Sequence, residues 1–208
     1  MFACFSSLSR PLVAVAMVAA SVFGAIAQQA PTVRVRGTIE SIDGPMLMIK
    51  SRDGADLKVR LSDNYAVAGI AEAKLSEIKP GSYIGVSATP EPDGTQKALA
   101  VHIFPEAQRG VAEGFRPWDL RPKSTMTNAT VADTVAGVDG EKILVKYKGG
   151  EKQVVVPPGT PIVTFVSAEK SEVKPGARII IFGATRKDDG TLETGLIAVG
   201  LGGITPPM

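Results

Sequence analysis

Ser76–Gly81 (Ser-Glu-Ile-Lys-Pro-Gly) and, 95 positions later, Ser171–Gly176 (Ser-Glu-Val-Lys-Pro-Gly) are nearly the same hexapeptide. Each leads into an apolar run, Tyr83–Val86 or Ile179–Phe182, and then into an Asp-Gly-Thr turn. Agreement in both order and spacing indicates an internal duplication. The chain is therefore expected to contain two copies of one folding unit.

Tight-turn signals divide each copy into short segments. Asp-Gly and Gly-Gly pairs accept the positive φ angles that two-residue hairpin turns require. Between these pairs, apolar and polar residues alternate with period two, as in Val33–Glu40, Leu57–Leu61 and Ile143–Lys148, which is typical of half-buried antiparallel strands. The Asp-Gly pairs begin at Asp43, Asp53, Asp93, Asp139 and Asp189, and a Gly-Gly pair stands at 149–150.

The turns give the same strand order twice. Three strands are followed by a longer connection that ends in the Ser-Glu-x-Lys-Pro-Gly turn, and two more strands follow; this is the order of an OB-type five-stranded barrel. The sequence predicts an all-β protein of two tandem OB-like five-stranded β-barrels, at 32–105 and 129–200. An ordered strap at 106–128, which holds the only tryptophan, joins them, and 201–208 is expected to be a loose C-terminal tail.

The first 27 residues have the pattern of a cleaved signal peptide. Arg10 precedes an apolar run, Leu12–Phe23, and Ala25-Ile26-Ala27 satisfies the small-x-small cleavage rule, so cleavage is predicted after Ala27. The predicted location is the periplasm. The only cysteine, Cys4, lies in the signal peptide, so the two cores must stabilise the mature chain without disulfides. No other apolar stretch is long enough to span a bilayer, and no membrane span is expected in the mature chain.

With these motifs together, the chain resembles a family of exported bacterial proteins with tandem OB-like domains of unknown function. The resemblance runs from Val33 to about Val199, and it includes the strap sequences Arg116–Leu120 and Ser124–Asn128. It implies export and two OB-like barrels, and it supplies no catalytic residues.

Metal binding is one alternative function. His102 is the only histidine, and Met46 and Met48 place two thioethers on one face of a strand, a donor set that suits Cu(I). One histidine makes no site without partners, and methionine in an apolar strand is more often core. A periplasmic copper-type carrier using Met46, Met48 and His102 therefore stays an alternative to the main interpretation, in which no cofactor is expected.

Enzymatic and nucleic-acid functions are disfavoured. Five of the 21 acidic residues begin Asp-Gly pairs, where Asp serves the turn, and there is no Gly-x-Ser-x-Gly elbow and no second histidine. The mature chain is nearly neutral and has few aromatic residues. A protein that binds single-stranded nucleic acid needs a basic groove with exposed aromatic side chains on which the bases stack.

The preferred interpretation is a non-enzymatic periplasmic binding or accessory protein. Its partner is an unidentified protein or small ligand. Binding residues often lie on loops that the fold does not need in order to close. In this chain such loops are the long strand connections and the strap. The candidate partner-binding residues are Phe115, Arg116, Trp118 and Leu120. A general role in envelope stress tolerance is a further alternative.

Overall fold

The computed structural model describes Met1 and residues 32–137 and 140–208. All but the first residue of the predicted signal peptide, and its cleavage site after Ala27, therefore lie outside the described residues. Within the described ranges the chain is all-β, with twelve strands in one continuous sheet and four single-turn 3-10 helices. No described helix is long and apolar enough to cross a membrane.

Five of these strands close into a barrel. Its ring order is β1–β2–β3–β12–β11 and back to β1, and every pair is antiparallel except β3 with β12. We call this set the first barrel: β1 (Thr32–Asp43), β2 (Met46–Ser51), β3 (Asp56–Glu72), β11 (Arg178–Arg186) and β12 (Leu192–Gly200).

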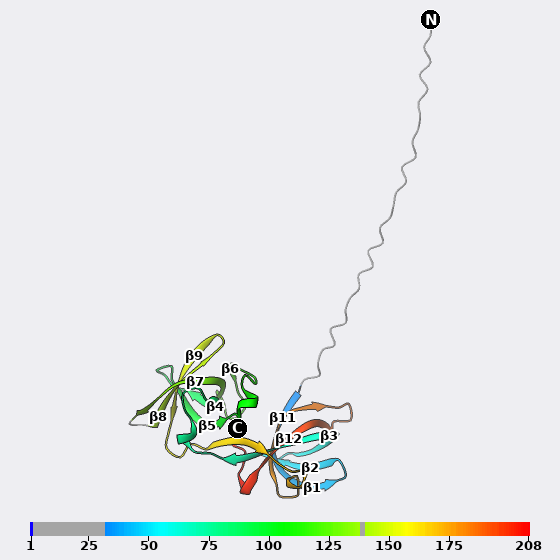
Figure 1. Cartoon of the computed structure of the whole chain (residues 1–208). Coiled ribbons are helices and arrows are strands. Elements are labelled where there is room, and N and C mark those ends of the chain that lie inside the picture. Colours follow the sequence, from blue (N-terminus) through cyan, green and yellow to red (C-terminus); the bar gives the residue numbers. More distant parts are fainter. Residues whose placement is uncertain (2–31, 138–139) are drawn as a thin grey trace.

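The remaining strands, apart from one that crosses between the two sides, lie on the other side of the molecule (Figure 1). We call five of them the second strand group: β4 (Tyr83–Pro90), β5 (Gln96–Ile103), β7 (Thr125–Gly137), β8 (Gly140–Tyr147) and β9 (Gly150–Val156). They pair in the order β5–β4–β7–β8–β9, and a short parallel pairing joins β5 to β9. A short edge strand, β6 (Gly114–Pro117), pairs with β7, and β10 (Ile162–Ser167) pairs with both β3 and β5.

The repeated motifs fold in the same way. Each Ser-Glu-x-Lys-Pro-Gly segment begins within a 3-10 turn, Leu75–Glu77 in the first copy and Lys170–Glu172 in the second. In the first Asp-Gly-Thr turn, Asp93 Oδ1 accepts hydrogen bonds from the N–H (2.9 Å) and hydroxyl (2.7 Å) of Thr95. Asp189 and Thr191 reproduce both bonds, at 2.9 and 2.6 Å. The side chains that recur are thus the ones that make the turns.

The strands are distributed differently from the contiguous barrels expected at 32–105 and 129–200. The first barrel takes three strands from the first copy and the hairpin β11–β12 from the second; the second strand group takes β7–β9 from the second copy and β4–β5 from the first. The physical reason is the length of β3. No turn pair interrupts 62–72, so the strand runs on for 17 residues and carries the chain out of the first barrel. Its end pairs antiparallel with β10, the equivalent crossing segment of the second copy.

Three clusters of buried side chains match this arrangement. One lies inside the first barrel and includes Ile39, Leu47 and Ile181; another lies inside the second strand group and includes Ile84 and Ile143. The third lies at the junction, where Ile70, Val163, Ile180, Ala198 and Met208 pack together.

The C-terminal tail packs into that junction, which differs from the loose end expected for 201–208. Met208 is only 1% exposed, and Ile204 packs against the same cluster. The end of the chain therefore lies between the first barrel and the second strand group (Figure 1).

Candidate functional site

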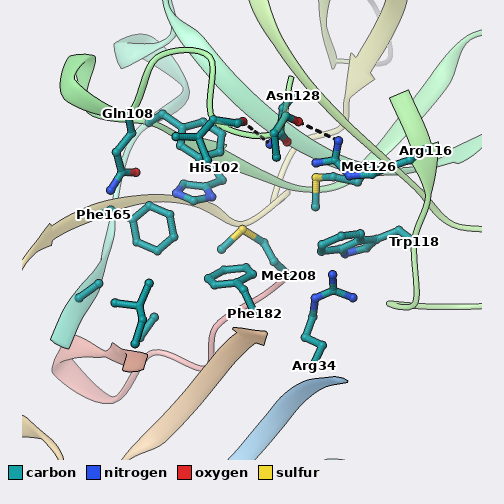
Figure 2. Close-up of a pocket in the computed structure, with 16 residues that line it drawn as sticks. Arg34, His102, Gln108, Arg116, Trp118, Met126, Asn128, Phe165, Phe182 and Met208 are labelled. Carbon is teal, nitrogen blue, oxygen red and sulfur yellow. Dashed lines mark hydrogen bonds between the residues drawn. The ribbon is translucent and has the colours of Figure 1, made fainter. Parts of the chain in front are cut away.

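The junction contains a cavity of about 550 Å³. Side chains from the first barrel, the second strand group, the crossing strands, the strap and the C-terminal tail all line it (Figure 2). The volume lies within the range of small-ligand sites, about 300–1,000 Å³.

Strand alternation explains which side chains reach the cavity. On β5, Val101 and Ile103 pack into the core of the second strand group, so His102 faces the opposite way. On β12, Ile197 and Val199 belong to the first barrel's core, while Ala198 faces the junction. The cavity is therefore formed by the outward faces of strands whose inward faces fill the two other cores.

Most of the lining is apolar and aromatic. Ring stacking organises one wall, where the His102 imidazole stacks on Phe104 with centroids 4.4 Å apart and meets the edge of Phe165 at 3.9 Å. Phe165 in turn meets the edge of Phe182 at 6.0 Å. The large apolar side chains that line the cavity are Phe104, Trp118, Met126, Phe165, Phe182 and Met208.

His102 is a neutral group in this wall. It is 3% exposed, and burial lowers the pKa of its imidazole to about 3. The side chain therefore offers one N–H donor and one nitrogen acceptor at neutral pH, rather than a charge.

The cavity also collects the unsatisfied polar atoms. Within residues 32–137 and 140–208, five buried side-chain atoms have no hydrogen-bond partner: Arg34 Nε, His102 Nε2, Trp118 Nε1, Thr127 Oγ1 and Asn128 Oδ1. All but Thr127 belong to residues that line this one cavity. Buried polar atoms normally have partners, so their concentration here calls for an explanation.

The strap forms the polar end. Trp118 lies between Arg34 and Arg116 (Figure 2), and the Arg34 guanidinium carbon is 3.7 Å from the ring centroid. Asp119 pairs with Arg34 at 2.8 Å and with Arg36 at 2.7 Å. Burial alone would raise the pKa of Asp119, but the hydrogen bonds from the two arginines outweigh it and lower that pKa to about 2. These contacts fix the strap to β1 of the first barrel.

Ser124 stabilises a backbone turn within the strap. Its hydroxyl lies 3.0 Å from the main-chain oxygen of Trp118 and accepts the N–H of Arg121 at 3.0 Å. The strap is therefore built to hold Trp118 in place.

Gly85 on β4 makes room for the neighbouring side chains. A Cβ at this position would lie 2.9 Å from Asn128 Oδ1 and 3.1 Å from the Phe104 ring. Gly85 pairs with Asn128 on one side and with His102 on the other. A side chain here would therefore displace the groups that line the cavity.

Only some of the residues predicted from the sequence line the cavity. Arg116, Trp118 and His102 line the same cavity. Phe115 is 40% exposed, with Lys152 Nζ 4.6 Å from its ring centroid, and the half-buried Leu120 does not line the cavity.

Met46 and Met48 are not part of this site. They lie on the face of β2 opposite the core residues Leu47 and Ile49, and they do not line the cavity that His102 lines. In the part of the chain that the structure describes, no three His, Cys, Asp or Glu side chains gather to hold a metal ion.

The residues at this site that were not predicted from the sequence include Arg34, Gly85, Asn128, Phe165 and Phe182. One signal was available for Phe182, because the uninterrupted run Ile179–Phe182 indicates a strand that is buried on both faces. Gly85 and Asn128 gave no such signal.

No protein-family model, curated protein or solved structure matches this chain. The geometry of the cavity is therefore the basis for the functional argument.

Proposed function

We propose that this chain is an exported, non-enzymatic binding protein that holds a small molecule in the junction cavity. One observation carries the proposal: four of the five unsatisfied buried side-chain atoms in the described ranges belong to residues lining this single cavity. Each such atom costs roughly 1–3 kcal/mol when it has no partner. A bound molecule with matching donors and acceptors would remove that cost.

The character of the lining supports the same proposal. Binding sites for small molecules are mostly apolar walls with a few polar groups that fix orientation. The aromatic wall around His102 and the polar end around Trp118 have this division. This division suits a molecule held in one orientation, and the proposed role is binding.

The proposed architecture is a pair of OB-like modules that have exchanged hairpins. The ring order of the first barrel, with its parallel β3–β12 pair, supports an OB-like module, and β7–β8–β9–β5–β4 repeats that order in the second strand group. On this proposal the ligand lies between the modules.

Export is part of the proposal and rests on the sequence of residues 1–27. Fractionation of cells expressing the full chain, with N-terminal sequencing of the periplasmic product, tests it. A product that begins at Gln28 is expected. Retention of the uncleaved chain in the cytoplasm would refute export without touching the cavity.

A neutral apolar dye tests whether the cavity accepts a molecule. We expect N-phenyl-1-naphthylamine to bind with saturable fluorescence at one equivalent. Ala68 lines the cavity, whereas Ala66, two positions earlier on β3, is exposed and does not. Ala68→Phe should abolish the signal by filling the space, and the matched control Ala66→Phe should retain it. Absence of dye binding by the wild type, or equal binding by both variants, would refute a ligand cavity.

A further inference from the structure

We infer that the cavity takes an aromatic carboxylate that also carries an O–H or N–H donor away from its acid group. This inference deepens the proposed function and rests on it. Three features of the lining carry it: an excess of positive charge with unsatisfied donors at one end, an unsatisfied acceptor elsewhere, and aromatic walls between them.

The charge excess lies around Trp118. The guanidinium carbons of Arg34, Arg36 and Arg116 lie 3.7, 5.9 and 6.0 Å from its ring centroid. Asp119 pairs with Arg34 and Arg36. Arg116 donates to the main-chain oxygen of Ala112 at 2.7 Å and has no carboxylate partner among the described residues. Arg36 Nε also donates to the main-chain oxygen of Met208. Acceptors therefore face both Arg34 and Arg36, and the excess positive charge at this end is that of Arg116.

The unsatisfied atoms at this end are both donors. Arg34 Nε and the indole Nε1 of Trp118 can only donate, and both are buried without an acceptor. A carboxylate has two acceptor oxygens and one negative charge. It therefore meets the need for acceptors and for charge at once, through charge-assisted hydrogen bonds. A neutral or cationic ligand would leave Arg116 without a counter-charge.

Asn128 has the opposite requirement. Its Nδ2 donates to the main-chain oxygen of Val111 at 3.1 Å, which fixes the orientation of the amide. Its Oδ1 is then an acceptor with no donor. The neutral His102, whose Nε2 also has no partner, lies on the adjoining wall (Figure 2). A ligand O–H or N–H supplies the donor that Asn128 lacks.

The walls between these groups suit a flat aromatic body. Phe104, Phe165 and Phe182 present rings, and Met126 and Met208 present thioethers, which pack well against aromatic groups. The volume of about 550 Å³ has room for a bicyclic ring system.

Calorimetric titration of the full mature chain with a matched series tests the inference. The four probes are 6-hydroxy-2-naphthoate, 2-naphthoate, 2-naphthol and 2-naphthylmethylamine. The hydroxynaphthoate should bind tightest. Loss of the acid group should weaken binding about tenfold or more, loss of the hydroxyl should weaken it about fivefold, and the amine should bind most weakly. Equal binding of 2-naphthol and the hydroxynaphthoate, or tighter binding of the amine than of 2-naphthoate, would overturn the ligand class.

Two variants test which residues cause the preferences for the acid group and for the hydroxyl group of the ligand. Arg116→Met should weaken binding of both acids about tenfold and leave 2-naphthol unchanged. Arg121→Met is its matched control, because Arg121 lies on the same strap outside the cavity. Asn128→Ala should remove the preference for the hydroxynaphthoate over 2-naphthoate. Full retention of both preferences in these variants would refute the residue assignments.

Failure of the ligand class and failure of the proposed function are distinguishable. Bound N-phenyl-1-naphthylamine that none of the acids displaces would overturn only the ligand class. Failure of the dye itself to bind would overturn the cavity as a ligand site and this inference with it.

Discussion

Lowering the pH from 7 to 5 should destabilise the folded chain through His102. The imidazole is 3% exposed, and burial lowers its pKa from 6.5 to about 3. Between these two values the unfolded chain binds a proton that the folded chain does not, so stability falls as the pH falls through this window.

The magnitude follows from the two pKa values. Once the pH is below 6.5, each further pH unit costs about 1.4 kcal/mol of unfolding free energy, down to the folded pKa. Between about pH 7 and pH 5 the loss should be about 2 kcal/mol. His102 is the only histidine of the chain, so no other side chain of its type titrates in this window.

Urea denaturation at several pH values measures this loss. His102→Phe is the control variant, because its ring can occupy the space between Phe104 and Phe165 and cannot take up a proton. The wild type should lose about 2 kcal/mol between about pH 7 and pH 5, and the variant should lose little. In parallel, the imidazole resonance should not titrate above about pH 4 in the folded protein. An equal loss in both proteins, or an imidazole that titrates near its usual pKa, would refute the reasoning.

Three further predictions concern the strap, the cavity and the exchange of hairpins. Asp119→Asn should lower the unfolding free energy at neutral pH by about 1 kcal/mol, a figure reduced for the exposure of the carboxylate. Because the pKa of Asp119 is lowered to about 2, its contribution is present above the unfolded value of 3.8 and is lost toward pH 2; chemical denaturation of both proteins across this range checks it, and an acid-independent difference would contradict it. Gly85→Ala should weaken dye binding because its Cβ would press on Asn128 and Phe104, whereas Gly183→Ala, whose Cβ would make only ordinary contacts with Thr32, should not; equal dye affinities would contradict the crowding. A protease site inserted at Lys123 should give two fragments that stay together in gel filtration after cleavage and separate only in denaturant; separation in native buffer would contradict the exchange.

The repeated turns could be predicted from the sequence because turn geometry is local. Asp93 and Asp189 recur because each accepts the same two hydrogen bonds from a threonine two residues on. Asp-Gly pairs then fix where a hairpin begins and ends. Strand alternation similarly identified the residues that fill the inside of each strand group.

The partner of each hairpin was not readable, because it depends on a longer-range effect. Both hairpins have the same Asp-Gly-Thr turn between two strands, so these local features do not choose between the two sets of three strands. The choice follows from β3, which continues through 62–72 and pairs with β10. From the sequence, 62–81 is expected to be the longer connection that ends in Ser-Glu-Ile-Lys-Pro-Gly, and such a connection would let the chain turn back into its own barrel.

Pairing between strands that are far apart in the sequence also limited the prediction of the site. The strap was identified by composition, because a tryptophan between prolines is unusual in a flexible linker, and Trp118 and Arg116 do line the cavity. Their neighbours Arg34, Asn128 and Phe165 come from β1, β7 and β10. These strands are far apart in the sequence and meet only in the folded chain, so no local pattern could bring the residues together.

The duplication also explains how one cavity can have two different ends. Counted from the Asp-Gly-Thr turns, His102 of the first copy corresponds to Ala198 of the second, and both residues line the cavity. Counted from the Lys-Pro-Gly segments, Gly85 corresponds to Ile180, which is fully buried in the junction cluster. The exchange thus brings equivalent positions to one junction, where the first copy supplies an imidazole and an open space while the second supplies apolar packing. Two identical copies would give a symmetric cavity with two equal half-sites. Divergence at these positions instead leaves a single cavity with distinct polar and apolar sides, as binding of one molecule in one orientation requires.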